Sequence, residues 1–335
     1  MAAPRVSILL PVFDAAATLD ACLRSVRRQT FRDWECVIVD DGSRDASLAH
    51  ARRHADADPR FRVIARPHRG LVPALSEGLA HCRGALVARM DADDLMHRER
   101  LAAQTAALEG APALAAVGCH VWLFPRRELA DGMRAYERWL LSIDSPRRVR
   151  EEAFVECPVA HPSLMIRTEV LRSLGYRERG WPEDYDLVLR LLESGDRLGV
   201  VPKRLLAWRT GKTRLSFTSD VYSIERFTAC KAAFLARGFL AGGEHYILWG
   251  YGATGRGLQR ALREHGKRPS AIVELHPRRL GERIQGAPVI PPQALAQRHN
   301  DPQLVSVAGA EARGLIRNEL AQMGYRETLD YVCCA

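Results

Sequence analysis

The chain has 335 residues, of which 47% are hydrophobic and 27% charged, and its formal net charge is +9. This composition is that of a folded globular protein, and the length favours two domains over one. No apolar run approaches the roughly 20 residues that span a bilayer, and the first residues lack the basic start of a signal peptide. We therefore expect a cytoplasmic protein.

The positive charge is spread along the chain as arginine. It fits either a solvated surface or attraction to anionic ligands, such as a nucleotide diphosphate or the inner face of a membrane, where peripheral contact stays open. No basic block interleaved with aromatic residues occurs, so we expect no nucleic-acid partner. The eight cysteines form no C-x-x-C pair and no Cys/His cluster, and we interpret most of them as small buried hydrophobes.

The first 100 residues alternate short apolar runs with helical patterns. Strands are predicted at Val6–Val12, Trp34–Val39, Phe61–Ala65 and Ala85–Met90. This alternation predicts an α/β fold with a mainly parallel sheet and helices on both faces. Ligands bind at the carboxyl ends of such strands, which is where two acidic clusters occur.

The rest of the chain predicts further elements and a second domain. Strands are expected at Leu114–Val121 and Ser163–Ile166, a short helix capped by Thr168, and a helix over Glu183–Glu193. A second strand–helix alternation begins at His245. We expect a domain at 1–218, a connecting helix and linker at 219–243, and a small Rossmann-like domain at 244–335.

The sharpest chemical signal is Asp91-Ala92-Asp93-Asp94, at the end of the fourth predicted strand. Three carboxylates within four residues repel one another, so a positive partner is expected between them. A hard divalent cation with oxygen ligands meets that need and would also bind phosphates. The alternative is an acidic helix start, since Asp favours the first turn of a helix.

Two more acidic segments allow two interpretations each. Asp40-Asp41-Gly42-Ser43 closes the second strand and fits either a contact to a base or ribose, or a turn with a helix cap. Glu183-Asp184 opens a helix and fits either a general base that deprotonates an acceptor hydroxyl, or capping of the first turn.

Taken together, these segments resemble the GT-A glycosyltransferases of family 2 over nearly all of residues 5–217. The resemblance rests on five segments in the family's order and spacing: Pro11-Val12-Phe13 with Gln29-Thr30, Trp34-Glu35 through Ser43, Arg89 through Asp94 (similar to the DxD motif) with Arg100-Leu101 and Gln104, His161-Pro162-Ser163, and Glu183 through Leu187.

The resemblance implies a role for each matching position. It implies that a Mg²⁺ or Mn²⁺ ion is held by Asp93 with Asp91, that Asp184 is the catalytic base, and that the reaction inverts the anomeric centre. His161 and Glu183 would lie on the acceptor side, although a histidine before proline is often only a hydrogen-bonded loop residue. The donor-binding residues that it implies are Pro11, Phe13, Asp40, Asp41, Arg69 and Asp91.

Several positions depart from the family's pattern. Asp14 and Ser76 stand where Asn is common, and Gly211 stands where His is frequent, which puts a contact to metal or phosphate in doubt. Lys212 could supply positive charge there instead. These departures support an alternative in which the chain is a non-catalytic nucleotide-sugar-binding or regulatory protein with the GT-A fold.

The C-terminal region carries a separate motif. Gly250-x-Gly252-x-x-Gly255 follows a predicted strand and opens a helix, and Glu274 follows about 20 residues later, as in dinucleotide-binding loops. The region resembles the small Rossmann-like domain of sugar-modifying acyltransferases. It fits either a second nucleotide or sugar-nucleotide site or a structural module.

We therefore expect an enzyme, a hexosyltransferase-like glycosyltransferase. Its donor would be a UDP-, dTDP- or GDP-linked sugar and its acceptor a sugar or a lipid-linked glycan, in the biosynthesis of surface polysaccharide or lipopolysaccharide. A nucleotidyltransferase would need a Gly-rich loop with Arg and Lys after the first strand, which the residues Phe13–Ala17 do not provide.

Overall fold

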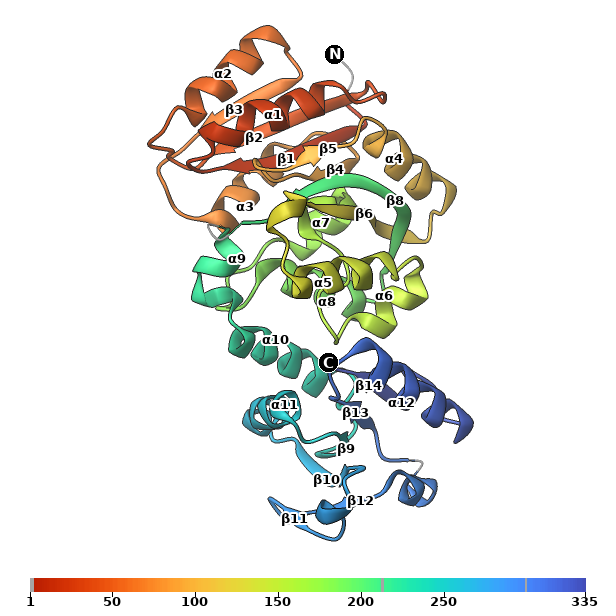
Figure 1. Cartoon of the computed structure of the whole chain (residues 1–335). Coiled ribbons are helices and arrows are strands. Elements are labelled where there is room, and N and C mark those ends of the chain that lie inside the picture. Colours follow the sequence, from red (N-terminus) through yellow and green to blue (C-terminus); the bar gives the residue numbers. More distant parts are fainter. Residues whose placement is uncertain (1–2, 212–213, 299) are drawn as a thin grey trace. The chain divides into compact units, whose positions relative to one another are not determined.

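The computed structural model describes residues 3–211, 214–298 and 300–335. Contacts between residues divide the chain into two compact units, whose elements are labelled in Figure 1. Unit 1 comprises Met1–Val149, Val159–Arg179 and Arg190–Arg214, and unit 2 comprises Arg150–Pro158, Gly180–Leu189 and Leu215–Ala335. Each unit is described by itself.

Unit 1 is built on an eight-stranded sheet with the order β3-β2-β1-β4-β7-β6-β8-β5. The first four strands pair in parallel and β7 is antiparallel to both of its neighbours, so the predicted mainly parallel α/β sheet is confirmed. The strands are β1 (Val6–Val12), β2 (Trp34–Asp40), β3 (Phe61–Ala65), β4 (Leu86–Arg89), β5 (Leu95–Met96), β6 (Leu114–Phe124), β7 (Met165–Arg167) and β8 (Arg197–Arg209).

The central strands are apolar because both of their faces are covered. Every residue of β1 and β2 is buried. One face, with Ile8 and Ile38, forms a core with α1 (Ala16–Arg27) and α2 (Ser47–Ala57). The other face packs against α3 (Leu71–His81), where a Cβ on Gly78 would lie 2.3 Å from Leu9 Cδ1.

Pro11 is tolerated inside β1 because of the register. The last pair between β1 and β4 joins Leu9 to Arg89, so Pro11 lies beyond the end of β4. The strand therefore loses no ladder hydrogen bond on that side through the missing N–H of proline.

The remaining helices of unit 1 correct two expectations. Thr168 is not an N-cap: it is the first residue of α7 (Thr168–Leu174), and its hydroxyl donates to the carbonyl of Gly84 at 2.6 Å. Asp94 does not start a helix, since β5 follows it and α4 (Arg100–Gly110) begins later. The other helices of this part of the chain are α5 (Asp131–Leu141), α6 (Pro146–Glu152) and α8 (Glu183–Glu193).

Unit 2 contains a second sheet with the order β11-β12-β10-β9-β13-β14, parallel except for β11. Its strands are β9 (His245–Trp249), β10 (Arg268–Val273), β11 (Arg283–Ile284), β12 (Ala287–Ile290), β13 (Gln303–Val305) and β14 (Tyr331–Cys333). Helices α10 (Ile224–Arg237) and α11 (Ala253–Glu264) share a core with one face, and α12 (Ala310–Gln322) shares a core with the other. The predicted strand–helix alternation from His245 is confirmed.

Among the described residues, no helix combines the length and the apolar character needed to pass through a bilayer.

Candidate active site

Four loops of unit 1 lie at one edge of the sheet. Strands β1, β2, β3 and β4 run parallel, so the segments that follow them meet at their carboxyl ends. These segments are residues 13–15, 41–46, 66–70 and 90–94. Most of the donor and metal residues predicted from the sequence lie in or beside these loops.

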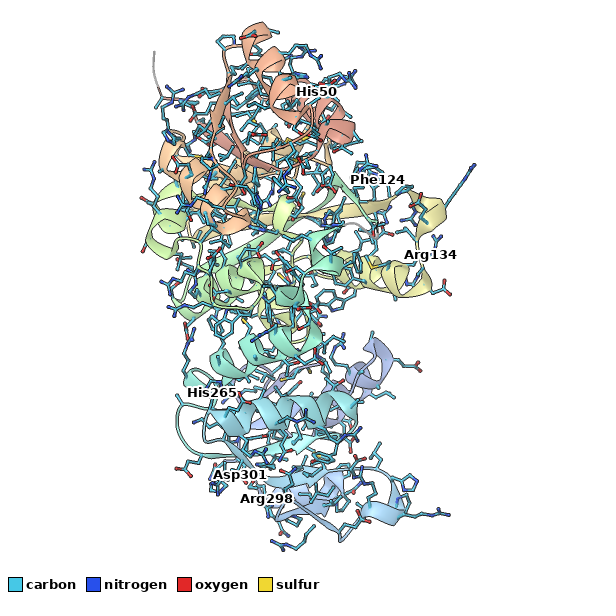
Figure 2. The ribbon with its side chains drawn as sticks, turned by 90° about the vertical axis from the view of Figure 1, so that its left-hand side faces the viewer. His50, Phe124, Arg134, His265, Arg298 and Asp301 are labelled. Atoms are coloured by element: carbon cyan, nitrogen blue, oxygen red, sulfur yellow. The ribbon has the colours of Figure 1, made fainter. Side chains whose placement is uncertain are left out.

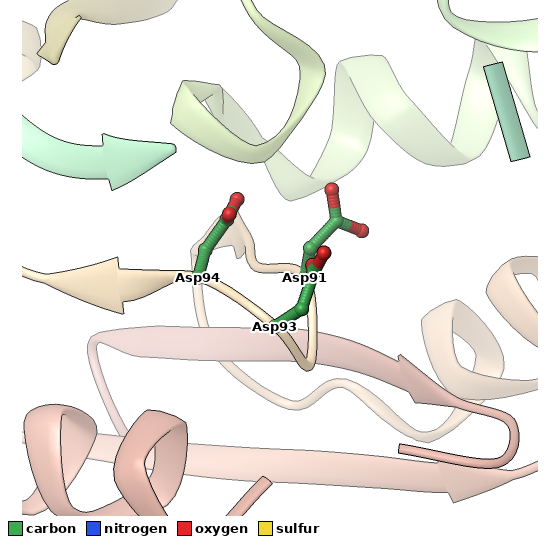
Figure 3. A group of neighbouring side chains, drawn as sticks. All are labelled: Asp91, Asp93 and Asp94. Carbon is green, nitrogen blue, oxygen red and sulfur yellow. The ribbon is translucent and has the colours of Figure 1, made fainter. Parts of the chain in front are cut away.

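The three aspartates that follow β4 form a compact cluster. One carboxylate oxygen from each of Asp91, Asp93 and Asp94 lies within 4.8 Å of the others, as Figure 3 shows. The cluster occupies the loop between β4 and β5. Sequence spacing alone left open whether these side chains converge, and the structure shows that they do.

Asp94 anchors this loop to β8. It is fully buried, and its Oδ1 accepts the backbone N–H of Arg209 at 2.7 Å. The guanidinium of Arg209 donates to the carbonyl of Asp93 at 2.8 Å and lies over the ring of Phe124, which is labelled in Figure 2. Burial, with the nearby carboxylates of Asp91 and Asp93, raises the pKa of Asp94 well above its usual value.

Asp91 and Asp93 have opposite electrostatic surroundings. Burial would raise the pKa of Asp91, but the positive groups of Arg89, Arg214 and His161 lower it, and Arg89 Nη2 lies 2.7 Å from Asp91 Oδ1. Burial and the charge of Asp91 raise the pKa of Asp93. Negative charge is therefore less compensated at Asp93 than at Asp91, and a cation bound between these two partly exposed carboxylates would offset it.

The cluster fits a hard divalent cation. Asp91 and Asp93 are partly exposed, so they can offer carboxylate oxygens to a ligand, whereas Asp94 is buried against β8. Oxygen atoms are the ligands that Mg²⁺ prefers and that also suit Mn²⁺. The fit supports the predicted pairing of Asp93 with Asp91.

Asp41 organises the loop that follows β3. Its carboxylate lies 3.1 Å from Arg66 Nε and 2.9 Å from His68 Nδ1, and it accepts the backbone N–H of Gly70 at 2.8 Å. The ring of His68 stacks on Phe13 with centroids 4.1 Å apart. Phe13 thereby presents a partly exposed aromatic surface at the sheet edge, which suits stacking of a flat base.

Arg66 and His68 were missed from the sequence. The signal that could have found them is their position: they follow a third parallel strand, so their loop had to meet the loops after β1 and β2. Arg69, which was predicted, is an exposed residue, and its backbone N–H donates to the Asp41 carboxylate at 3.2 Å.

The loops after β1 and β2 are joined by hydrogen bonds. Asp14 adopts a positive φ of 47°, and its Oδ1 accepts the N–H of Arg44 at 2.7 Å. Asp40 is buried and accepts the N–H of Ser43 at 3.2 Å, while Pro11 is a buried strand residue. The aspartate at position 14 therefore serves the fold of this edge.

The residues predicted for the acceptor side belong to different units. His161 belongs to unit 1 and is buried in a short 3-10 helix, with its ring 5.8 Å from that of Tyr176. Glu183 and Asp184 belong to unit 2 and open α8 as predicted. The phenol of Tyr222, which was not predicted, donates to Glu183 Oε2 at 2.5 Å.

The structure shows what surrounds Ser76 and Gly211, two of the residues that depart from the family pattern. The hydroxyl of Ser76 donates to the carbonyl of Val72 within α3 at 2.9 Å. Gly211 lies where an added Cβ would meet nothing. Lys212, suggested as a source of positive charge, lies outside the described residues.

The glycine loop of unit 2 joins β9 to α11. Gly250 has a φ of +89°, and a Cβ on Gly255 would lie 2.3 Å from the carbonyl oxygen of Gly250, whereas a Cβ on Gly252 would meet nothing. Glu274 Oε1 accepts the N–H of Tyr251 at 3.0 Å. Two of the three glycines thus serve packing and turn geometry, and a nucleotide site here stays a prediction.

The fold of unit 1, with its acidic cluster at the carboxyl edge of the sheet, is that of a GT-A glycosyltransferase. The chain belongs to the glycosyl transferase family 2, whose model matches residues 7–175, and it is a glycosyltransferase. It is 28% identical over 249 residues to the amylovoran biosynthesis glycosyltransferase AmsE of Erwinia amylovora, covering 72% of this chain and 91% of that protein.

Two solved structures share the fold. TarS 1-349 of S. aureus in complex with UDP-GlcNAc matches with a TM-score of 0.56 and 15% identity, covering 78% of this chain and 71% of TarS. The mannosyltransferase PcManGT of Pyrobaculum calidifontis, in complex with GDP-Man and Mn²⁺, matches with a TM-score of 0.51 and 19% identity. The match covers 97% of this chain and 82% of PcManGT.

Proposed function

We propose that this glycosyltransferase is an inverting, metal-dependent enzyme that transfers a sugar from a nucleotide-sugar donor to an acceptor hydroxyl. Its donor is a UDP-, dTDP- or GDP-linked sugar, and its acceptor is a sugar or lipid-linked glycan of a cell-surface polysaccharide or lipopolysaccharide. The names of AmsE, TarS and PcManGT, with the ligands in the last two structures, support these substrate classes.

The observation that carries the proposal is the convergence of Asp91, Asp93 and Asp94 beside the loops that follow β1, β2 and β3. A base stacked near Phe13 and a diphosphate near the aspartates would use this single edge. Asp40, Asp41, Arg69 and Pro11 lie in or beside the same loops and complete the proposed donor site.

Asp93 and Asp91 would hold a Mg²⁺ or Mn²⁺ ion. When bound, the ion supplies positive charge to the donor diphosphate. The positive groups of the chain itself, Arg89 and Arg214, lie close enough to Asp91 to lower its pKa and keep that carboxylate ionised. An ionised Asp91 is a prerequisite for cation binding at neutral pH.

Asp184 would act as the general base. It takes the proton of the acceptor hydroxyl while the acceptor oxygen forms a bond to the anomeric carbon of the donor. The bond between that carbon and the phosphate oxygen breaks, and the nucleoside diphosphate leaves with the electron pair. A single in-line displacement inverts the anomeric centre.

The test uses Asp184→Asn with a panel of p-nitrophenyl glycoside acceptors. We expect the variant to lose about 100-fold or more in kcat, because general bases contribute that much, while its affinity for the donor is unchanged. NMR of the product should show an inverted anomeric configuration. A retained configuration, or full activity without this carboxylate, would contradict the mechanism.

The departures at Ser76 and Gly211 favour the alternative of a non-catalytic nucleotide-sugar-binding or regulatory protein. The same assay separates the two: metal-dependent nucleotide binding without release of nucleoside diphosphate, with every acceptor offered, would support the alternative.

A further inference from the structure

We propose that Tyr222 of unit 2 is a positioning residue that fixes the first turn of α8 through Glu183. This inference rests on the proposed function, because its purpose is to hold the neighbouring Asp184 in place. It assigns a role to the C-terminal half of the chain that does not need a second nucleotide.

The first contact is direct. Tyr222 ends a 3-10 helix (Asp220–Tyr222) that precedes α10, and its phenol donates to Glu183 Oε2 at 2.5 Å. A hydrogen bond to a charged acceptor is about twice as strong as one between neutral groups. Glu183 is 6% exposed, so the bond forms where water competes poorly.

The second set of contacts holds the same turn through Tyr185, the residue that follows Asp184. Tyr185 is fully buried, its ring stacks on Phe227 of α10 with centroids 4.5 Å apart, and its hydroxyl donates to the carbonyl of Ala153 at 2.8 Å. Asp184 therefore stands between two residues whose side chains are both fixed by unit 2. Such fixed neighbours restrict the backbone of a catalytic residue.

The segment that contacts Tyr185 is itself held by two basic side chains, buried Lys231 and partly buried Arg317. Lys231 of α10 donates to the carbonyls of Val155 at 3.1 Å and Cys334 at 2.7 Å. Arg317 of α12 pairs with buried Glu152 at 2.8 Å and with Glu327 at 2.7 Å. Residues 150–158 are thus fastened to the last helix and the last residues of the chain.

These contacts form two connected branches. One runs from α12 and the C-terminal residues through residues 150–158 to Tyr185. The other runs from Phe227 of α10 to Tyr185 and from Tyr222 to Glu183. Both branches end on the turn that carries Glu183 and Asp184. Positional errors of about 1 Å at a catalytic group can cost about 100-fold in rate, so loosening one branch should be visible in kcat.

The test compares Tyr222→Phe with Tyr246→Phe in the full chain. Tyr246 is a matched control in the same unit, because its buried hydroxyl has no hydrogen-bond partner among the described residues. Release of nucleoside diphosphate is measured at saturating donor with p-nitrophenyl glycosides, and binding of UDP, dTDP or GDP with Mn²⁺ is measured by calorimetry.

We expect Tyr222→Phe to lower kcat about tenfold with unchanged nucleotide affinity, and Tyr246→Phe to leave kcat unchanged. In a Glu183→Ala background, which has no side-chain acceptor for the Tyr222 hydroxyl, the loss caused by Tyr222→Phe should shrink to less than twofold. Tyr185→Phe, which removes the bond to Ala153, should also lower kcat selectively.

Wild-type kcat in both Tyr222→Phe and Tyr185→Phe would overturn the inference, as would additive losses in the Glu183→Ala background. These outcomes leave the proposed function intact. By contrast, a wild-type chain that binds no nucleotide with Mn²⁺ and releases no nucleoside diphosphate would contradict the proposed function itself, and the inference with it.

Discussion

At the scale of single residues, buried charge in unit 1 is used both for structure and for chemistry. Glu35 in β2 is a structural case. Its carboxylate accepts the hydroxyl of Ser7 at 2.8 Å and contacts Arg83 Nη2 at 2.7 Å and Arg62 Nη1 at 3.0 Å. Burial alone would raise the pKa of Glu35, but these hydrogen bonds lower it below its usual value.

We predict that Glu35→Gln lowers the free energy of unfolding by about 2 kcal/mol at pH 7, because it replaces a buried carboxylate that accepts hydrogen bonds from two partly exposed arginines, and hydrogen bonds to charged groups contribute about 1.5 to 3 kcal/mol. A carboxyl with a lowered folded-state pKa stabilises the fold above its unfolded-state pKa of about 4.3, and this contribution is lost as the pH falls through the folded-state value. Unfolding curves of both chains between pH 7 and pH 3.5 test this. The gap between them should narrow on acidification, and a constant gap would contradict the assignment.

Removing the hydroxyl of Tyr246 should raise the free energy of unfolding, in contrast to the substitution at Glu35. Its fully buried hydroxyl has no partner among the described residues, and an unsatisfied buried polar group costs about 1 to 3 kcal/mol. Tyr246→Phe should therefore raise the free energy of unfolding by about 1 kcal/mol. The matched control is Tyr325→Phe, which removes a bond of 2.8 Å to the carbonyl of Leu295 and should destabilise. Equal destabilisation by both substitutions would contradict this explanation.

At the scale of elements, the packing of α11 on the sheet of unit 2 depends on one glycine. A Cβ on Gly255 would lie 2.3 Å from the carbonyl oxygen of Gly250 and 2.7 Å from Ser306 Oγ. The helix can move away from β9 only by losing contacts such as those of Leu258 and Leu262 in the core. At Gly252, three residues earlier, an added Cβ would meet no atom within 4 Å.

We predict that Gly255→Ala costs about 3 kcal/mol of stability, at the upper end for overpacking, because the nearest atom is rigid backbone. Gly252→Ala should cost only a few tenths of a kcal/mol, since its φ of −71° suits alanine. Denaturant unfolding of the two variants measures both values. Similar losses in both would show that the loop, and not the close approach of helix and sheet, limits stability.

The elements were predictable where periodicity and burial agree. The limits of Val6–Val12 match β1, because a fully buried strand leaves an uninterrupted apolar run, and the limits of Phe61–Ala65 match β3, although Phe61 is its only buried residue. Strand β5 was not predicted, because two residues are too few to show an alternating pattern. The position of Thr168 inside α7 was missed, because no sequence pattern reveals what a single hydroxyl binds. The helix over Glu183–Glu193 was found because its apolar positions repeat at helical spacing.

The candidate site was predictable only in part, for a different reason. Asp91, Asp93 and Asp94 lie within four residues of sequence, so the acidic motif could be recognised, but only the structure shows that their side chains converge. The partners Arg66, His68 and Tyr222 reach Asp41 and Glu183 across long stretches of chain, so no local pattern marks them. Their hydrogen bonds exist only once the sheet order and the loop ends are known.

At the scale of the whole molecule, unit 2 is assembled from three separate segments of the chain. Contacts assign Arg150–Pro158 and Gly180–Leu189 to the unit that contains the C-terminal sheet, although both segments lie within residues 1–218. A truncation near residue 218 would expose the buried Glu152, Tyr185 and the backbone that Lys231 binds. We therefore expect a chain truncated near residue 218 to be less stable than the full chain.

The most direct test of the proposed metal site is calorimetric binding of UDP-, dTDP- and GDP-sugars to the full chain with Mn²⁺ or Mg²⁺, with and without a chelator, and to Asp93→Asn. We predict that one nucleotide-sugar binds at least tenfold more tightly with the metal, and that Asp93→Asn removes this gain without unfolding the chain. Binding that is equally tight with chelator, or unchanged in Asp93→Asn, would contradict the claim that the aspartate cluster after β4 is the metal site for the donor.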